Sequence, residues 1–205
     1  MIMSKKQIQD RICQLIYRAE TFLKWSNQLL DIYEKGWDNC KNSPENQYNF
    51  YNTPNTKCII IHHVLYFQET VIILHTLFET KKHPTEISFA YYFTNNKGNN
   101  LEKKINEIRE EYRAAHLDIF RNKLIAHKQA DSVGDPLTGF LNPVKKEYIE
   151  KACSIIEKLR RLVINNFNCA VNNYFGDYYN SGFEVLYKIC ESVSEKRIQT
   201  IKKIQ

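Results

Sequence analysis

Glycine and proline are scarce in this chain, which has 6 Gly and 5 Pro among 205 residues. These residues interrupt helices and build tight turns, so their scarcity argues against a loop-rich fold and against disorder. No stretch alternates apolar and polar residues for long enough to predict a strand. Apolar residues make up 43% of the chain and charged residues 25%, which is typical of a globular protein. The sequence therefore predicts an all-α fold.

Several common functional signatures are also missing. The sequence contains no glycine-rich phosphate loop, no nucleophile elbow and no dinucleotide fingerprint, which removes the enzyme classes built on them. The start, MIMSKKQIQD, lacks the pattern of a signal peptide, and no two cysteines form a C-x-x-C pair. We therefore expect a cytoplasmic protein in which six widely spaced cysteines are reduced thiols: Cys13, Cys40, Cys58, Cys153, Cys169 and Cys190.

The most apolar run, CIIIHHVLYFQETVIIL, is broken by His62, His63, Gln68 and Glu69. It is too short and too polar in its middle for a membrane span, so it predicts a buried helix and no membrane partner. The net charge of +6 is compatible with a polyanionic partner but does not require one. Because Lys and Arg are spread along the chain, a solvated helical surface is the simpler interpretation.

Apolar residues recur with the 3.6-residue helical period over most of the chain. The stretch 36–56 contains Gly, Pro and several Asn and predicts a loop. The expected helices cover about 4–34, about 57–80, a short piece capped by Thr85, a long helix from Asn100 as far as His127, one from Asn142-Pro143 to about Tyr174, and about 182–203. We expect a single domain, 1–205: a bundle of four to six long antiparallel helices.

A metal site has one weak candidate. Cys58 and His62 stand four residues apart, so both side chains can face one ion from a single helical turn. A complete site needs further ligands, and no second Cys/His pair follows at a usable spacing. Packing in or near the core is the favoured interpretation, and neither a metal nor a cofactor is predicted.

The stretch FRNKLIAHK, residues 120–128, is the clearest functional candidate. An arginine followed at short range by a histidine is common by chance, as the pair Arg109 and His116 illustrates. An asparagine directly after the arginine lowers the chance expectation to roughly two in a hundred. The motif residues Arg121, Asn122 and His127 are also expected at the end of a long helix, where polar side chains can leave the bundle and meet a ligand.

RNKLIAHK resembles the signature of the HEPN superfamily (higher eukaryotes and prokaryotes nucleotide-binding), an Arg, a polar residue and then a His after four to six positions. The order of expected helices from about Ile59 to Phe167 is similar to the abortive-infection branch of that superfamily. The resemblance implies a HEPN-like core over about 57–175, with the terminal helices packed on it. It further implies a homodimer in which two motifs face each other across a cleft. Many members are metal-independent ribonucleases that act as toxins or antiphage effectors, and others only bind.

The motif residues suit RNA cleavage by the adjacent 2′-hydroxyl. The imidazole of His127, with an ordinary pKa of about 6.5, can accept or donate a proton near neutral pH. Arg121 stays charged and can hold two phosphate oxygens, while Asn122 can orient the histidine or donate to phosphate. Lys123 and Lys128 are expected to bind substrate by adding positive potential. Some superfamily toxins carry a tyrosine two residues after the histidine, where partner enzymes modify it; Gln129 stands there in this chain.

Helical geometry favours a site shared by two chains. Six residues advance an ideal helix by about 600°, which leaves Arg121 and His127 roughly 120° apart around the axis. Either the helix ends at His127 and turns that side chain back, or a symmetric dimer pairs the arginine of one chain with the histidine of the other. Two other interpretations remain open: a catalytically inactive helical module that binds nucleic acid or a protein partner, and a structural helix end where cations favour the C-terminal dipole.

Overall fold

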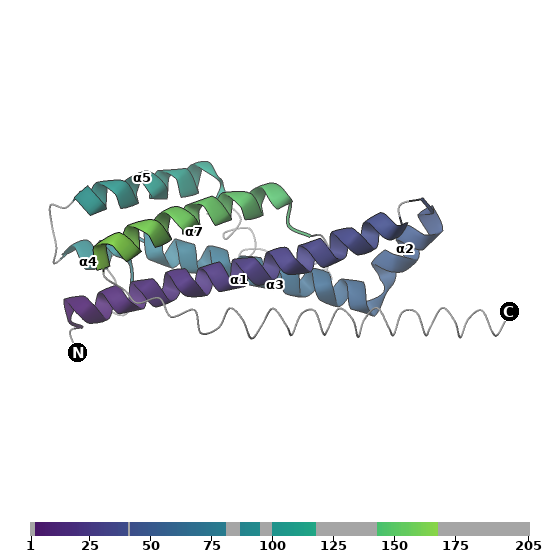
Figure 1. Cartoon of the computed structure of the whole chain (residues 1–205), viewed down its shortest axis with the longest axis horizontal. Coiled ribbons are helices and arrows are strands. Elements are labelled where there is room, and N and C mark those ends of the chain that lie inside the picture. Colours follow the sequence, from purple (N-terminus) through teal and green to yellow (C-terminus); the bar gives the residue numbers. More distant parts are fainter. Residues whose placement is uncertain (1–2, 41, 81–86, 95–99, 118–142, 168–205) are drawn as a thin grey trace, which may run out of the picture.

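A computed structural model describes residues 3–40, 42–80, 87–94, 100–117 and 143–167 (Figure 1). Within these ranges the chain forms six helices and no strand, which confirms the predicted all-α fold. The helices are α1 (Lys5–Cys40), α2 (Pro44–Asn52), α3 (Pro54–Phe78), α4 (Phe89–Thr94), α5 (Asn100–Ala114) and α7 (Lys146–Phe167).

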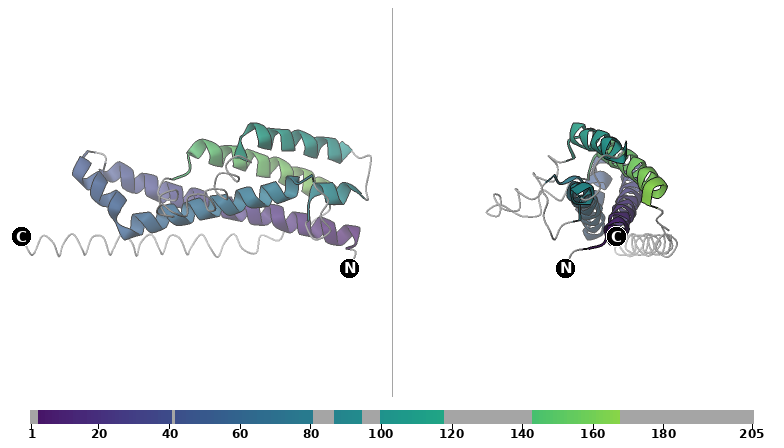
Figure 2. Two further views of the ribbon diagram at one scale, coloured as in Figure 1. Left: turned by 180° about the vertical axis from the view of Figure 1, so that it is seen from behind. Right: turned by 90° about the vertical axis from the view of Figure 1, so that its left-hand side faces the viewer.

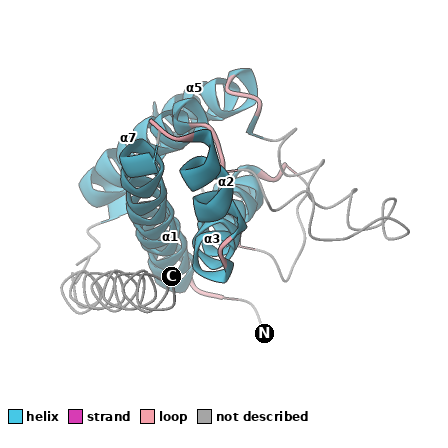
Figure 3. Cartoon of the chain, turned by 90° about the vertical axis from the view of Figure 1, so that its right-hand side faces the viewer, coloured by secondary structure: helices cyan, strands magenta, loops and turns pink. Residues whose placement is uncertain are grey.

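Four long helices follow one another around a common core in the order α3, α1, α7, α5. Each runs antiparallel to the next in this series, as Figure 1 and the end-on view in Figure 2 show. The helix α1 has 36 residues and spans about 54 Å at 1.5 Å per residue, so it extends beyond α5 and α7. The short helix α2 contacts both α1 and α3 at this extended end (Figure 3).

The core forms because each long helix has one apolar face. On α1 this face repeats at three- and four-residue intervals, and on α7 it does the same, which buries both stripes against neighbouring helices. The helix α3 has twelve buried residues, more than any other described helix. The largest fully buried side chains of the long helices are Ile8 and Ile12 on α1, Ile60, Phe67, Leu74 and Leu77 on α3, and Leu159 on α7.

The predicted loop over 36–56 is wrong. The helix α1 continues to Cys40 and includes Gly36. The ring of Phe50 occupies the space beside the Gly36 Cα, where a larger residue would have its side chain. A Cβ at Gly36 would lie 2.5 Å from two atoms of that ring. The rings of Tyr33 and Trp37 complete the contact, with centroids 5.9 Å and 6.4 Å from the Phe50 ring. Gly36 therefore permits close packing and does not end the helix.

The prolines of the same stretch begin helices. Ser43 caps α2, its hydroxyl accepting from the Asn46 N–H at 3.3 Å, and Pro44 is the first helical residue. Thr53 caps α3 through the Thr56 N–H at 3.2 Å, followed by Pro54. Proline suits this first position because its missing N–H has no intrahelical acceptor there. The start of α3 thus precedes the predicted residue 57.

The third long helix was predicted to continue to His127, but α5 ends at Ala114. His116 adopts a left-handed backbone with φ of 58°, and its N–H donates to the Arg113 carbonyl at 2.9 Å. A residue in this conformation terminates a helix by turning the chain away from the axis. The continuous helix from Asn100 to His127 is therefore wrong at residues 115–116.

Two further helix starts differ from the prediction. The hydroxyl of Ser88 accepts from the Tyr91 N–H at 3.2 Å and caps α4, whereas Thr85, the predicted cap, lies outside the described residues. The helix α7 begins at Lys146 rather than at Pro143. The reason is a tertiary contact: the Val144 N–H donates to the side chain of His63, and the Val144 side chain is buried.

The cysteines do not all behave as predicted. Cys40, Cys58 and Cys153 are free thiols. Cys13, on the buried face of α1, is disulfide-bonded, so the expectation of a reduced thiol is wrong there. The spacing of the cysteines could not predict this bond, because a disulfide depends on proximity in the fold. The two remaining cysteines, Cys169 and Cys190, lie outside the described residues.

The apolar run 58–74 lies within α3, and one face of it is buried in the core as predicted, whereas Cys58, His62 and Leu65 are exposed. By length and mean hydropathy this helix also meets the minimum for crossing a membrane. Half of its most apolar window is buried inside the protein, and core helices of soluble proteins have the same properties. Its composition alone is weak evidence for a membrane span.

Candidate functional site

The predicted catalytic residues Arg121, Asn122 and His127, and the predicted substrate-binding residues Lys123 and Lys128, lie outside the described residues. The structure therefore neither brings them together nor separates them. The structure does show how the chain packs on either side of residues 118–142, at Leu117 and at Val144. The functional assignment of the motif stays a prediction.

Both flanking positions belong to the core. Leu117 is fully buried after the left-handed turn at His116, and Val144 is buried before the start of α7. Both side chains are part of the same apolar cluster as α1 and α3. The chain thus enters and leaves the stretch that carries the motif at buried positions.

A buried histidine holds the second of these positions. His63, on α3, accepts the Val144 N–H at its Nε2 atom with a distance of 3.0 Å. Its Nδ1 atom lies 2.8 Å from the backbone oxygen of Ser26 on α1 and 2.9 Å from the Ser26 hydroxyl. That hydroxyl donates to the His63 carbonyl at 2.9 Å. We call Ser26, His63 and Val144 the His63 junction, because it joins α1, α3 and the residue just before α7.

The partners of His63 define its protonation state. A backbone amide can only donate, so Nε2 must carry a lone pair, and the ring proton resides on Nδ1, where the Ser26 carbonyl accepts it. Burial lowers the pKa of His63 below its usual 6.5, because a charged ring would lose its hydration. Hydrogen bonding with the backbone at Ser26 and Val144 opposes this shift without overcoming it. The ring is therefore neutral at pH 7.

The sequence analysis did not predict this junction, because it considered His63 only as one of several polar residues that interrupt the apolar run 58–74. A histidine inside an otherwise apolar helical run is a usable signal, since a buried imidazole needs a partner on each ring nitrogen. The sequence does not show which residues are the hydrogen-bond partners of His63, because Ser26 and Val144 lie 37 and 81 residues away from it.

The pair Cys58 and His62 lies on the surface of α3, not in or near the core as interpreted from sequence. The Cys58 sulfur is 3.4 Å from the Nδ1 atom of His62, and that nitrogen is also 2.8 Å from the Cys58 carbonyl oxygen. The predicted proximity on one helical turn is thus present. Among the described residues, no three or more His, Cys, Asp and Glu side chains group as metal ligands.

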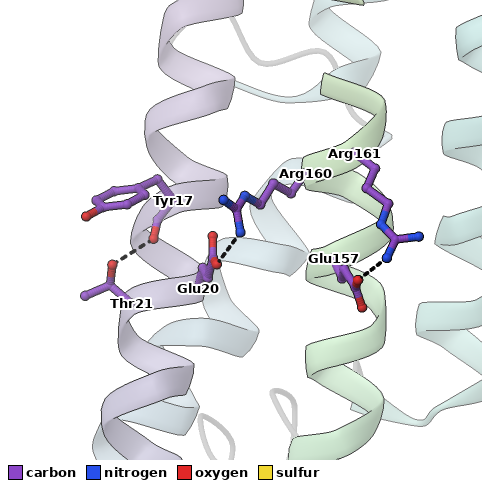
Figure 4. Close-up of polar contacts among 6 residues, drawn as sticks. All are labelled: Tyr17, Glu20, Thr21, Glu157, Arg160 and Arg161. Carbon is purple, nitrogen blue, oxygen red and sulfur yellow. Dashed lines mark hydrogen bonds and ion pairs between the residues drawn. The ribbon is translucent and has the colours of Figure 1, made fainter. Parts of the chain in front are cut away.

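Several of the described surface cations form ion pairs with carboxylates. Arg160 of α7 points toward Glu20 of α1, with its Nη1 atom 2.9 Å from the carboxylate, whereas Arg161 pairs with Glu157 on its own helix (Figure 4). Lys158 likewise pairs with Glu111 of α5. Such paired cations offer less attraction to a phosphate backbone than a cluster of unpaired ones.

One hollow on the described surface lies along α5. It is a wide, open depression of about 510 Å³, lined by Glu102, Lys103, Asn106, Glu107 and Glu110. A single helix supplies all of its lining, and three of the five side chains are carboxylates that would repel phosphate.

Comparison of the chain with protein-family models, with curated proteins and with solved structures finds no match.

Proposed function

We propose that this protein is a HEPN-like, metal-independent endoribonuclease of the toxin or antiphage type, acting as a homodimer in the cytoplasm. The observation that carries the proposal is the RNKLIAH motif, which places an arginine, an asparagine and a histidine within seven residues. The all-α antiparallel bundle is compatible with it. A partner antitoxin would be expected to restrain such an activity.

In this proposal His127 either accepts the proton of the attacking 2′-hydroxyl or donates a proton to the leaving oxygen. Arg121 offsets the charge that develops on the phosphorane, and Asn122 orients the imidazole or donates to phosphate. Lys123 and Lys128 bind the RNA backbone. The nucleophile belongs to the substrate and the charge is met by guanidinium, so the reaction requires no metal ion.

The test is incubation of the purified protein with total RNA in excess chelator. His127→Ala is expected to lower the cleavage rate by about a hundred to ten thousand times, and Arg121→Ala by a similar factor. The matched controls are Arg113→Ala and His116→Asn. Arg113 is half exposed in an ion pair with Glu110, and Asn tolerates the left-handed backbone of residue 116. Both controls should cleave at the wild-type rate.

A mixing experiment tests whether the site spans two chains. If the arginine of one chain works with the histidine of the other, a heterodimer of Arg121→Ala and His127→Ala contains one intact site. An equal mixture of the two inactive variants should then recover about a quarter of wild-type activity after subunit exchange. If subunit exchange is confirmed and the mixture still has no cleavage activity, the site is not shared between two chains.

The remaining outcomes separate the alternatives. Wild-type protein that binds RNA without cleaving it, and binds more weakly after Arg121→Ala, would identify an inactive binding module. Loss of helical circular dichroism in either motif variant would show that FRNKLIAHK is a structural helix end.

A further inference from the structure

The His63 junction combines features that make it sensitive to acid. The His63 side chain is 1% exposed, and both ring nitrogens have partners on other elements, Ser26 on α1 and Val144 ahead of α7. Only the neutral ring can accept the Val144 N–H. A protonated ring would direct a second N–H at that amide over a donor–donor distance of 3.0 Å.

Among the residues that the structure describes, no nearby charge compensates a protonated ring. The charged or titratable side chains near the junction in sequence are exposed or partly exposed: Lys24, Asp31, His62, Tyr66, Glu69, Lys145, Lys146 and Glu147. None of them contributes to the pKa of His63, which responds to burial and to the backbone at Ser26 and Val144. The imidazolium would therefore be buried without a carboxylate partner, an arrangement that proteins avoid.

We propose that the His63 junction is an acid-sensitive contact that holds the start of α7 against the α1–α3 pair. Protonation of His63 removes the acceptor of the Val144 N–H. The segment around Val144 then separates from α1 and α3 before the helices unfold. The proposal rests on the described contacts of Ser26, His63 and Val144, and it does not depend on RNA cleavage by the motif.

The direction of the pH dependence follows from the neutral ring. The pKa of His63 is lower in the folded protein than the value of about 6.5 expected in the open state. The stabilisation is therefore complete above about pH 6.5 and is lost as the pH falls from there to the folded pKa. Within that window the opening equilibrium should rise about tenfold per pH unit.

Amide hydrogen exchange by NMR on the full chain, between pH 7.5 and 5.0, measures this directly. After correction for the intrinsic exchange rate, the protection factor of the Val144 amide should fall about tenfold per unit below about pH 6.5. The amide of Leu159, in the middle of α7, should keep its protection, which would show that the opening is local. Equal losses at Val144 and Leu159 would overturn the proposal, because they indicate global unfolding.

Two variants complete the test. His63→Gln supplies an amide oxygen that can accept the Val144 N–H but does not titrate, so its Val144 protection should be independent of pH. His62→Gln changes the exposed neighbour and should retain the wild-type pH dependence. If His63→Gln does not fold, the wild-type ring shifts of His63 decide instead. Their titration midpoint must lie below pH 6.5, within the window in which Val144 loses protection. A midpoint above 6.5, or Val144 protection that is constant with pH, would refute the proposal.

Discussion

Replacing Gly36 by alanine tests whether this glycine exists for packing. Alanine normally stabilises a helix interior by about 1 kcal/mol relative to glycine. Here its Cβ would lie 2.5 Å from the Phe50 ring, so that ring must move. Its contacts with Tyr33 and Trp37, at 5.9 Å and 6.4 Å, are each worth about 0.5 to 1.5 kcal/mol. Losing both offsets the helical gain, and Gly36→Ala should destabilise the protein by up to about 2 kcal/mol.

A double-mutant cycle with Phe50→Ala isolates this effect. Without the ring, Gly36→Ala meets no obstruction and should stabilise the protein by about 1 kcal/mol. The sign of the alanine effect should therefore reverse between the two backgrounds, with a coupling of at least about 1 kcal/mol. Urea unfolding followed by circular dichroism gives all four free energies. Additivity within about 0.5 kcal/mol would refute the packing explanation of Gly36.

Two further predictions concern the turn after α5 and the cysteines. His116 has φ of 58°, so His116→Gly should stabilise the protein by about 1 kcal/mol, whereas β-branched His116→Val should destabilise it. Thermal denaturation of both variants measures this, and equal melting temperatures would exclude strain at His116. Because Cys13 is disulfide-bonded, thiol titration of unfolded, unreduced protein should detect four of the six cysteines. Detection of all six would show that the bond is absent.

Apolar periodicity predicted the long helices of this fold well, because each buries one face and leaves the other in water. The prediction over 36–56 was wrong because Gly and Pro were read as breakers. In the structure, Gly36 makes room for Phe50, and Pro44 and Pro54 follow capping hydroxyls. The pattern of a capping residue followed by proline was present in the sequence and could have been used.

Other differences had no local signal. The stop at Ala114 uses a histidine, His116, in a conformation usually adopted by glycine, and the delayed start of α7 depends on a contact between Val144 and His63, 81 residues apart. Tertiary contacts of this kind override local propensity. For the candidate site, the sequence supplied residue types and spacing only. The roles of Arg121 and His127 and the homodimer stay predictions, since the described residues do not include the motif.

The His63 junction also orders events during synthesis. The antiparallel pair α1 and α3 is complete once residue 78 has been made, and its contacts are close in sequence, which favours early formation. At that stage Nε2 of His63 has no Val144 N–H to accept, so the emerging hairpin contains a polar atom that still needs water. Only when the ribosome has added Val144 can this site close and exclude solvent. A chain that stops before residue 144 therefore leaves a polar atom in its core without its donor.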